Sequence, residues 1–387
     1  MSRHPQSVRT LTALATAMAL AGCASSGTPA PSSAAPASLP ALHSCPTSQT
    51  SAQQPPTGQG QPALQITSAK TVAPSDNSTS TVLTDLTGPQ IQCGRVAVTS
   101  VNDVVFATPL ANGAPKQLKL DVLVPKTEGP KPLVVYVPGG GFMIAPKSLA
   151  LDQRTYLAES GFVVASVEYR TVPDGATWSD GVTDVKAAIR YLRAHAGEYQ
   201  IDPSRVGVWG ESAGGYLASM AGVTNGMSQF DVGSNLDQSS AVQAVLDKFG
   251  PSDYSKVAAD FDAAAQRANY APDNNLAKYA GAGTGKSALE NLQAVARANP
   301  ITYVHRGDPP FLLMHGSADT AVSPSQTLIL HTALRAAGDD STRYVLQGAG
   351  HGDLAVLSGD ASTAKLWTTQ SVMNLMAEFL HKQLTSQ

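Results

Sequence analysis

The chain has 387 residues, which is enough for one large α/β domain or two smaller domains. Its formal net charge of -3 means that the chain lacks the excess of positive charge typical of proteins that bind nucleic acid. Charged residues make up only 14% and aromatic residues 6%, while 33 glycines and 26 prolines favour a loop-rich secreted protein over a helical bundle.

The first 23 residues predict an export signal rather than part of a folded domain. Arg3 and Arg9 precede the apolar stretch Leu11–Ala21, which is too short for a bilayer span of about 20 apolar residues. The stretch ends in Leu-Ala-Gly-Cys at Cys23, which resembles the lipobox of bacterial lipoproteins. The resemblance implies a signal peptide over 1–22 and a lipid on Cys23 that anchors an extracytoplasmic protein to a cell-envelope membrane. An ordinary secretory signal with an unrelated cysteine is the alternative.

The cysteines and the composition after the signal also favour export. With Cys23 lipidated, Cys45 and Cys93 remain as one candidate disulfide in an oxidising compartment, and two unrelated free thiols are the alternative. Residues 23–62 are rich in Ser, Ala, Pro and Thr, with too few apolar side chains to offset the entropy of ordering. We therefore expect a linker there, followed by one folded domain over 63–387.

Beyond the linker, apolar runs alternate with helical patterns. Leading antiparallel strands are predicted at 95–101, 104–110 and 118–124. Further strands are predicted at 132–138, 162–170, 205–210, 242–250, 310–316 and 343–350. Helical spacing is found at 150–160, 184–199, 325–337 and 364–384. This order predicts an α/β fold: a mostly parallel sheet with leading antiparallel strands and helices on both faces. The poorly periodic stretch 254–300 is expected to be a cap-like insertion over one end of the sheet.

The stretch Gly-Glu-Ser-Ala-Gly at 210–214 joins an apolar strand to a helix. Glycines two residues before and after Ser212 permit the tight turn on which a serine stands exposed above a sheet. The helix that follows points its positive N-terminal end at the reacting centre. The pattern therefore predicts Ser212 as a nucleophile, while Glu211 is interpreted as structural.

A nucleophilic serine needs a base and a group that orients the base. In this architecture the chain order is serine, acid, histidine. His351 follows a predicted strand in a glycine-flanked loop, and we predict that it is the base. Asp319 lies in the loop after the preceding strand and is the predicted acid, with Asp253 as the alternative.

The other histidines downstream of Ser212 have simpler interpretations. His315 ends a strand, so a buried and hydrogen-bonded side chain is expected. His331 and His381 lie on helical patterns and are expected at the surface. His305 lies in a loop, and nothing in the sequence selects it.

The glycines at 139–141 directly follow a predicted central strand and present consecutive backbone amides without side chains. A tetrahedral intermediate carries an oxyanion that needs such preorganised donors. Gly140 and Gly141, together with the amide of Ala213, are the predicted oxyanion hole. The sequence contains no C-x-x-C, H-E-x-x-H or G-x-x-x-x-G-K motif, and no metal or cofactor is expected.

These segments together resemble α/β-hydrolase esterases, particularly the feruloyl-esterase-like and hormone-sensitive-lipase-like groups. The similar pieces are LDVLVP, PGGGF, DVKAAIRYLRAHAGEYQIDPSRVGVWGESAGGYLA, ITYVHRGDPPFLLMHGSADTAVSPSQT and GAGHG. The resemblance implies the α/β-hydrolase fold, with Ser212 as nucleophile, His351 as base and Asp319 as orienting acid. The chain departs from the family at Pro138, where members usually carry histidine.

The expected activity is hydrolysis of carboxylic esters through an acyl-enzyme. By analogy with the family, we expect short acyl groups such as acetyl or feruloyl, on small molecules or polysaccharides. One alternative is a serine peptidase of the prolyl-oligopeptidase type, although too little chain precedes Leu118 for its usual propeller. The other is a surface lipoprotein that keeps the fold for binding alone.

Overall fold

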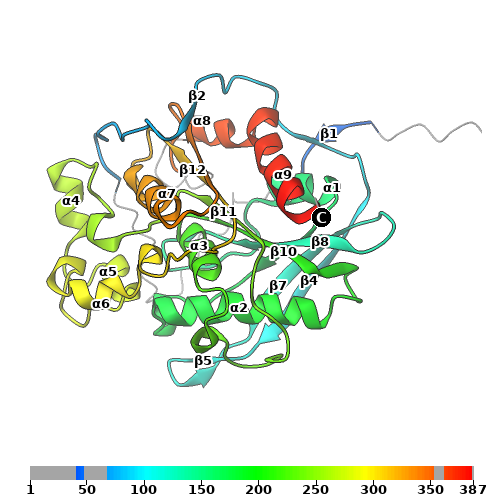
Figure 1. Ribbon diagram of the computed structural model, residues 1–387, viewed down its shortest axis with the longest axis horizontal. Coiled ribbons are helices and arrows are strands. Elements are labelled where there is room, and N and C mark those ends of the chain that lie inside the picture. Colours follow the sequence, from blue (N-terminus) through cyan, green and yellow to red (C-terminus); the bar gives the residue numbers. More distant parts are fainter. Residues whose placement is uncertain (1–40, 48–67, 353–360, 386–387) are drawn as a thin grey trace, which may run out of the picture. The chain divides into compact units, whose positions relative to one another are not determined.

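The fold is built around one large sheet (Figure 1). The computed structural model describes residues 41–47, 68–352 and 361–385, all within the unit Pro40–Gln387. Nine strands of the described residues form the sheet in the order β2-β13-β12-β11-β10-β8-β9-β7-β4. Their bounds are β2 Thr81–Leu83, β4 Val98–Ala107, β7 Leu118–Pro125, β8 Lys131–Val137, β9 Val163–Val167, β10 Ile201–Glu211, β11 Ala244–Lys248, β12 Phe311–Gly316 and β13 Ser341–Leu346.

The sheet is parallel except at one edge. Strand β7 pairs antiparallel with both β4 and β9, and the other neighbouring pairs among the described strands are parallel. The antiparallel strands come early in the chain, as predicted. The predicted α/β class, with a mostly parallel sheet and leading antiparallel strands, is therefore confirmed.

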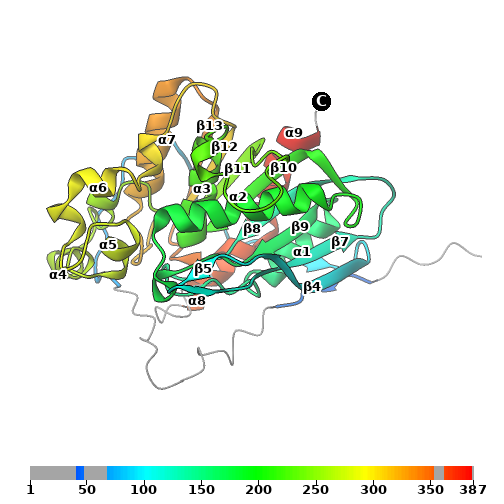
Figure 2. The same ribbon diagram turned by 90° about the horizontal axis from the view of Figure 1, so that it is seen from below.

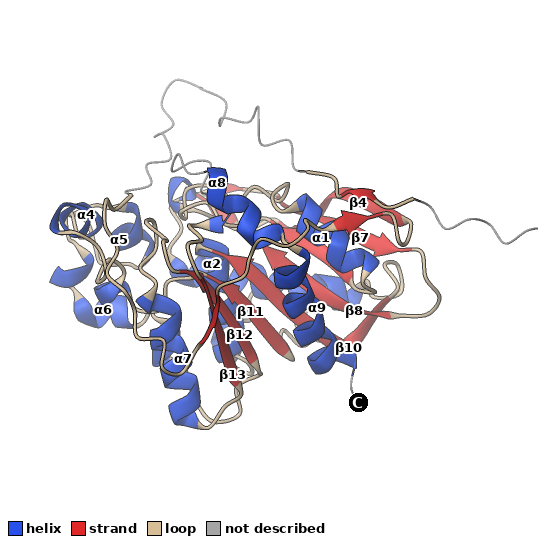
Figure 3. Ribbon diagram, turned by 90° about the horizontal axis from the view of Figure 1, so that it is seen from above, coloured by secondary structure: helices blue, strands red, loops and turns tan. Residues whose placement is uncertain are grey.

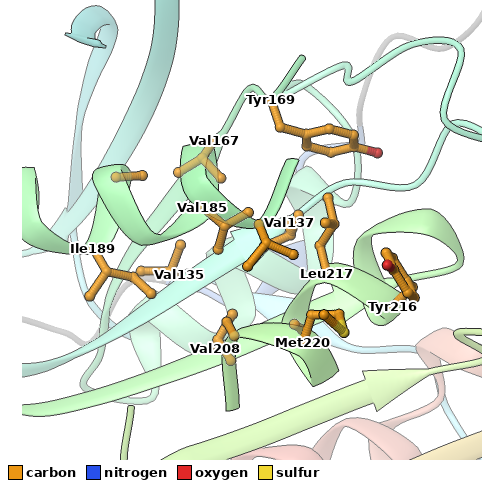
Figure 4. Packing of buried hydrophobic residues seen from close by; sticks show 14 of the residues in the cluster. Val135, Val137, Val167, Tyr169, Val185, Ile189, Val208, Tyr216, Leu217 and Met220 are labelled. Carbon is orange, nitrogen blue, oxygen red and sulfur yellow. The ribbon is translucent and has the colours of Figure 1, made fainter. Parts of the chain in front are cut away.

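Helices cover both faces of the sheet, as Figures 2 and 3 show from opposite sides. Along β8, Val135 and Val137 pack with residues of α2 and α3, seen in Figure 4. Val134 and Tyr136 point the other way, into a second cluster with residues of α1 and α9. All seven residues of β8 are buried, as expected for a strand covered on both faces. The helices are α1 Leu151–Glu159, α2 Trp178–Ala194, α3 Ala213–Val223, α7 Ser325–Ala337, α8 Ala361–Ala364 and α9 Gln370–Thr385.

Two predicted strands are one strand in the structure, and the helix predicted at 184–199 is α2, which begins at Trp178 and ends at Ala194. The predicted strands 95–101 and 104–110 form a single strand, β4, with a register shift between Val101 and Val104. Asp103 lies in that shift with φ of 60°, and its N–H donates to the Asp121 carboxylate at 2.8 Å. A bulge of this kind breaks the alternating pattern without ending the strand.

The insertion at 254–300 consists of short helices at one end of the fold (Figure 1). They are α4 Ala263–Asn269, α5 Asn275–Tyr279 and α6 Leu292–Ala296. Side chains cap them, because Asp262, Asn274 and Asn291 each accept a hydrogen bond from a backbone N–H in the first turn. Each helix is one or two turns long, which explains why no clear periodicity appeared in the sequence.

Part of the predicted linker is attached to the domain. Strand β1 (His43–Ser44) pairs antiparallel with β3 (Gln92–Cys93), and a disulfide joins Cys45 to Cys93. The prediction of a linker over the whole of 23–62 is therefore corrected at these residues, where a covalent bond replaces the missing apolar contacts. The predicted signal peptide 1–22, the lipidation residue Cys23 and the rest of the linker up to 62 lie outside the described residues.

None of the helices in the described ranges is both long enough and apolar enough to cross a membrane. A second two-stranded sheet, β5 (Leu110–Ala111) with β6 (Ala114–Pro115), forms a small hairpin beside the start of α2.

Candidate active site

The turn between β10 and α3 places Ser212 at the carboxyl edge of the sheet. Ser212 has φ of 56° and ψ of -120°, which is a sparsely populated conformation for a residue with a side chain. Its N–H donates to the carbonyl of Lys248, at the end of the neighbouring strand β11, at 2.9 Å. The strained backbone is thus held by the sheet itself.

Two glycines make this turn sterically possible. A Cβ at Gly210 would lie 2.0 Å from the carbonyl oxygen of Gly214. A Cβ at Gly214 would lie 1.9 Å from the carbonyl oxygen of Val137. Both positions therefore require glycine, and the second contact shows that the start of α3 touches the end of β8, where the glycine loop begins.

The three residues predicted as a triad lie in one hydrogen-bonded line. The hydroxyl of Ser212 lies 2.8 Å from Nε2 of His351, and Nδ1 of His351 lies 2.7 Å from Oδ2 of Asp319. The exposed fractions are 6%, 3% and 0% for the serine, histidine and aspartate. In this arrangement Nδ1–H donates to the carboxylate, and Nε2 is left to accept the serine proton.

Asp319 is buried but kept ionised by its neighbours. Burial alone would raise its pKa, but the charge of His351 and hydrogen bonds from His315 and His351 outweigh burial and hold the pKa well below its usual value. The other oxygen, Oδ1, accepts from the backbone N–H groups of Ala321 and Val322 at 2.9 and 3.0 Å. The carboxylate is thus fixed in position by four donors.

His315 is fully buried and hydrogen-bonded, as the sequence predicted. Its Nε2 lies 3.2 Å from Oδ2 of Asp319 and 3.1 Å from the carbonyl of Val322, so this nitrogen carries the proton. Its Nδ1 lies 3.0 Å from the hydroxyl of Thr327, which accepts a hydrogen bond from Arg343 at 3.0 Å. A second histidine therefore donates to the acid, at the same oxygen, Oδ2, that His351 contacts.

Arg343 extends this network to the segment before β2. Its guanidinium donates to the Ser80 hydroxyl at 2.7 Å and to the carbonyl of Pro324 at 2.9 Å. In the same region the N–H of Ala69 donates to the carbonyl of Thr320 at 2.8 Å. The loop that carries the acid is thus tied to residues 240 or more positions earlier in the chain.

The predicted oxyanion-hole residues flank the same corner. Gly140 and Gly141 have φ of 153° and 59°, in the loop directly after β8. Ala213 is the first residue of α3, and the N–H groups of the first turn of a helix have no carbonyl acceptor within the helix. The N–H of Ala213 can therefore donate to an oxyanion. At Pro138, where the resembling family carries histidine, the carbonyl accepts a hydrogen bond from the buried hydroxyl of Tyr169 at 2.9 Å. A tyrosine from the segment after β9 thus supports the start of the loop.

The insertion covers the glycine loop. Phe142, in that loop, stacks on Tyr279 of α5 with ring centroids 4.1 Å apart and packs edge-on against Tyr216 of α3 at 5.5 Å. The hydroxyl of Tyr216 donates to the carbonyl of Ala298 at 2.7 Å. The loop is therefore held between the helix that follows Ser212 and the insertion.

Other predicted candidates lie elsewhere or have structural contacts. Asp253 caps the turn Tyr254–Lys256, accepting from the N–H of Ser255 at 3.0 Å, whereas Asp319 is the acid beside His351. The prediction of a surface position for His331 is wrong, because it is 1% exposed and lies 2.8 Å from the Ser341 hydroxyl.

Sequence patterns did not predict the partners of Glu211 beneath the serine turn. Lys248, at the end of β11, is 1% exposed, and its Nζ lies 2.6 Å from Glu211 and 2.8 Å from Gln153. The adjacent charges of Asp247 and Lys248 in the otherwise apolar run AVLDKFG were the available signal. In the parts of the chain that the structure describes, no group of three His, Cys, Asp or Glu side chains could hold a metal ion.

Comparison with known proteins fits this geometry. The family described as BD-FAE matches residues 120–334, more than half of the chain. The chain belongs to the BD-FAE family. The matched span contains Ser212 and Asp319, and the BD-FAE sheet and helices described above are those of the α/β-hydrolase fold.

The BD-FAE chain is also similar to named esterases. It is 30% identical over 199 residues to the probable carboxylic ester hydrolase LipM of Mycobacterium tuberculosis, covering 51% of this chain and 43% of that protein. It is 30% identical over 225 residues to the esterase LipC of the same organism, covering 58% of this chain and 53% of that protein. The BD-FAE chain thus spans about half the length of these curated relatives.

A solved structure shows the same likeness in three dimensions. The truncated form of a carbohydrate esterase from gut microbiota superposes with a TM-score of 0.61 at 26% identity. The superposition covers 77% of this chain and 100% of that chain. The α/β-hydrolase fold predicted for this chain is therefore confirmed.

Proposed function

We propose that this BD-FAE protein is a carboxylic ester hydrolase that works through a serine acyl-enzyme. The observation that carries the proposal is the continuous line from the Ser212 hydroxyl through His351 to the ionised Asp319. The similarity to named esterases supports the same reaction class.

In the first half of the reaction, Nε2 of His351 removes the proton of the Ser212 hydroxyl while the oxygen attacks the ester carbonyl. The carbonyl oxygen becomes an oxyanion and is stabilised by the N–H groups of Gly140, Gly141 and Ala213. Asp319 stabilises the imidazolium through Nδ1–H. The imidazolium then gives its proton to the leaving alcohol as the carbon–oxygen bond breaks, and an acyl group remains on Ser212.

In the second half, water takes the place of the alcohol. His351 removes a proton from the water, whose oxygen attacks the acyl carbonyl and forms a second oxyanion in the same position. When this intermediate collapses, the proton returns from His351 to the Ser212 oxygen and the carboxylic acid leaves. The free enzyme is regenerated without any other reactant.

We further propose that the substrates are short acyl esters, such as acetyl or feruloyl groups on small alcohols or polysaccharides. The support is indirect: the BD-FAE match and the likeness to a structure titled as a carbohydrate esterase. Rates on p-nitrophenyl esters graded from two to twelve carbons, beside acetylated xylan and methyl ferulate, test this point. A rate that rises steadily with acyl length would contradict it.

The reaction is tested by Ser212→Ala, for which we expect turnover of p-nitrophenyl acetate to fall by about 10⁴-fold, as in other serine triads. A fluorophosphonate probe is expected to label the wild-type protein once and the variant not at all. Ser204→Ala, at an exposed position of β10, is the matched control and keeps both properties. The proposal would be wrong if Ser212→Ala were still labelled by the probe or still hydrolysed p-nitrophenyl acetate at the wild-type rate.

We also propose export as a lipoprotein anchored through Cys23 to a cell-envelope membrane. The Cys45–Cys93 disulfide supports an oxidising compartment, since such bonds are rare in the bacterial cytosol. In cells fed an alkyne fatty acid, the wild-type chain is expected to incorporate the label and sediment with membranes. Cys23→Ser is expected to lose both properties, and equal labelling of the two would contradict the assignment.

A further inference from the structure

A buried ion pair lies directly beneath the turn that carries Ser212. Nζ of Lys248 is 2.6 Å from Oε1 of Glu211, and their side chains are 1% and 5% exposed. The two residues face each other as the last register pair of β10 and β11. Each is joined to Ser212, because Glu211 precedes it in the chain and the carbonyl of Lys248 accepts its N–H.

Two neutral side chains also make hydrogen bonds to the pair. Oε1 of Gln153, on α1, accepts from Lys248 at 2.8 Å, and the hydroxyl of Tyr136, on β8, donates to Glu211 at 3.2 Å. The Lys248 ammonium also lies near the centres of three aromatic rings, at 5.0 Å for Trp367 and 5.7 Å for Trp209 and Phe249. Such an enclosure excludes water and lets charges act over a longer range than at the surface.

The same rings connect the pair to the proposed base. The ring of Phe249 lies 4.6 Å from the imidazole of His351, and the indole N–H of Trp367 donates to the carbonyl of Gly350 at 3.1 Å. Lys248 is therefore no more than about 10 Å from the imidazole of His351, a distance over which a buried charge still shifts proton binding.

A buried ion pair rarely adds stability over apolar side chains of the same volume. Here each charge alone would disturb the base. An uncompensated carboxylate at Glu211 would favour the imidazolium of His351, and an uncompensated ammonium at Lys248 would disfavour it. Together they present almost no net charge to the site.

Other charged groups also face the pair. From α1, Asp152 interacts with both charges of the pair, and Arg154 interacts with Glu211. His351 is itself hydrogen-bonded to Asp319, which is bonded in turn to His315. None of these groups contacts the ammonium of Lys248 as closely as Glu211 does.

We propose that Lys248 and Glu211 are positioning residues that fix the serine turn and cancel each other's charge beneath His351. Through this cancellation the pair sets the pH range in which the base is free to accept the serine proton. The inference rests on the proposed ester hydrolysis, because the reaction supplies its readout.

The test is the dependence of kcat/KM on pH for p-nitrophenyl acetate in the full chain. In Glu211→Gln the amide keeps the size of the side chain and leaves the ammonium uncompensated. We expect the acid limb to move to lower pH by about half a unit or more, the effect of a unit charge about 10 Å away in a protein interior. Lys248→Met is expected to move it to higher pH, and the double variant to restore the wild-type position.

Asp231→Asn is the matched control, because it breaks a comparably close pair, 2.6 Å apart, with the buried Arg190 of α2. We expect its acid limb to coincide with that of the wild type. If Lys248→Met does not fold, Glu211→Gln alone decides the question. The inference is overturned if folded Glu211→Gln has the acid limb of its kcat/KM profile at the wild-type pH, whatever the absolute value of kcat/KM.

The failure of the proposed function gives a different result. If the wild-type protein neither hydrolyses esters nor reacts with a fluorophosphonate, the hydrolase proposal fails. If both occur and depend on Ser212, the position of the acid limb tests the ion pair alone. The pH dependence of fluorophosphonate labelling gives a second measurement of the same limb without an ester substrate.

Discussion

The serine turn and the insertion at 254–300 both lie against the candidate site, but different forces hold them. The turn is fixed by backbone packing, in which glycines at 210 and 214 allow contacts that no side chain would permit. The insertion is fixed by side chains, such as the caps at Asp262 and Asn274 and the stacking of Tyr279 on Phe142. Backbone packing demands particular residues at particular spacings, whereas side-chain contacts can be made in many ways.

The comparison implies that changes in the turn remove activity, whereas changes in the insertion reduce stability. Among substitutions that leave Ser212, His351 and Asp319 in place, the largest effect is expected for Gly214→Ala, whose methyl group would collide with the carbonyl of Val137. We expect kcat/KM for p-nitrophenyl acetate to fall by about 10²-fold or more, since displacement of the serine by about 1 Å costs that much. In Gly197→Ala a Cβ meets no atom within 4 Å, and activity is expected to be unchanged. Equal activity of the two variants would contradict the steric account.

A smaller loss is expected at His315, which donates to the same oxygen of Asp319 as His351 does. His315→Leu removes that donor, and we expect kcat/KM to fall by about 10- to 100-fold, the range typical of groups that orient a catalytic residue. His315→Gln can place an amide N–H near the same carboxylate and is expected to recover part of the loss. No recovery, with both proteins folded, would mean that His315 only fills space.

A pH effect on stability is expected from Asp247, next to the turn. Burial raises its pKa to about 6, although hydrogen bonds from Ser219 and Gly250 oppose the rise. Because this value is above that of the unfolded chain, the folded state holds the proton more tightly, and the resulting stability is lost as pH rises from about 4 to above 6. Over this range wild-type stability should fall by on the order of 3 kcal/mol more than that of Asp247→Asn.

Urea unfolding at several pH values measures this difference. Asp237→Asn, in an exposed loop, is the control and should follow the wild-type curve. Parallel curves for wild type and Asp247→Asn would show that the buried carboxylate does not titrate in this window.

The smallest effect is expected in the insertion. Asn274→Ala removes the cap of α5, where the side chain accepts from the N–H of Leu276 at 2.8 Å. We expect a loss of about 1 kcal/mol in unfolding free energy, as for other helix caps, with kcat unchanged. A large fall in kcat with unchanged stability would reverse the comparison and make the insertion part of the catalytic machinery.

The same contrast explains how much the sequence predicted. The strands, the order of Ser212, Asp319 and His351, and the glycine loop follow from local patterns, because each depends on residues close together in the chain. The buried position of His331 depends instead on Ser341 and on Thr79, whose carbonyl lies 3.1 Å from its ring. Helical spacing cannot reveal such partners.

Lys248 was not predicted for a related reason, and neither was the fixed position of residues 43–45, although Cys45 and Cys93 were a candidate disulfide. A buried lysine needs Glu211 and Gln153 from two other elements, and their proximity exists only after folding. The residues at 43–45 have the composition of a linker, and a single disulfide to Cys93 gives them a fixed place. Composition and periodicity do not show which residues will pair in the folded chain, whether as an ion pair or as a disulfide.

The hydrogen bonds that Arg343 and Ala69 make around the acid loop bear on how this domain can be engineered. The span shared with the family ends at residue 334, before His351, and begins at 120, after Ser80 and Ala69. A segment cut to those limits would lack His351. It would also lack the hydrogen bonds that Arg343 and Ala69 make to the loop of Asp319. Transfer of the domain to another protein therefore calls for one segment that runs from residue 41 through α9 and so keeps the Cys45–Cys93 disulfide.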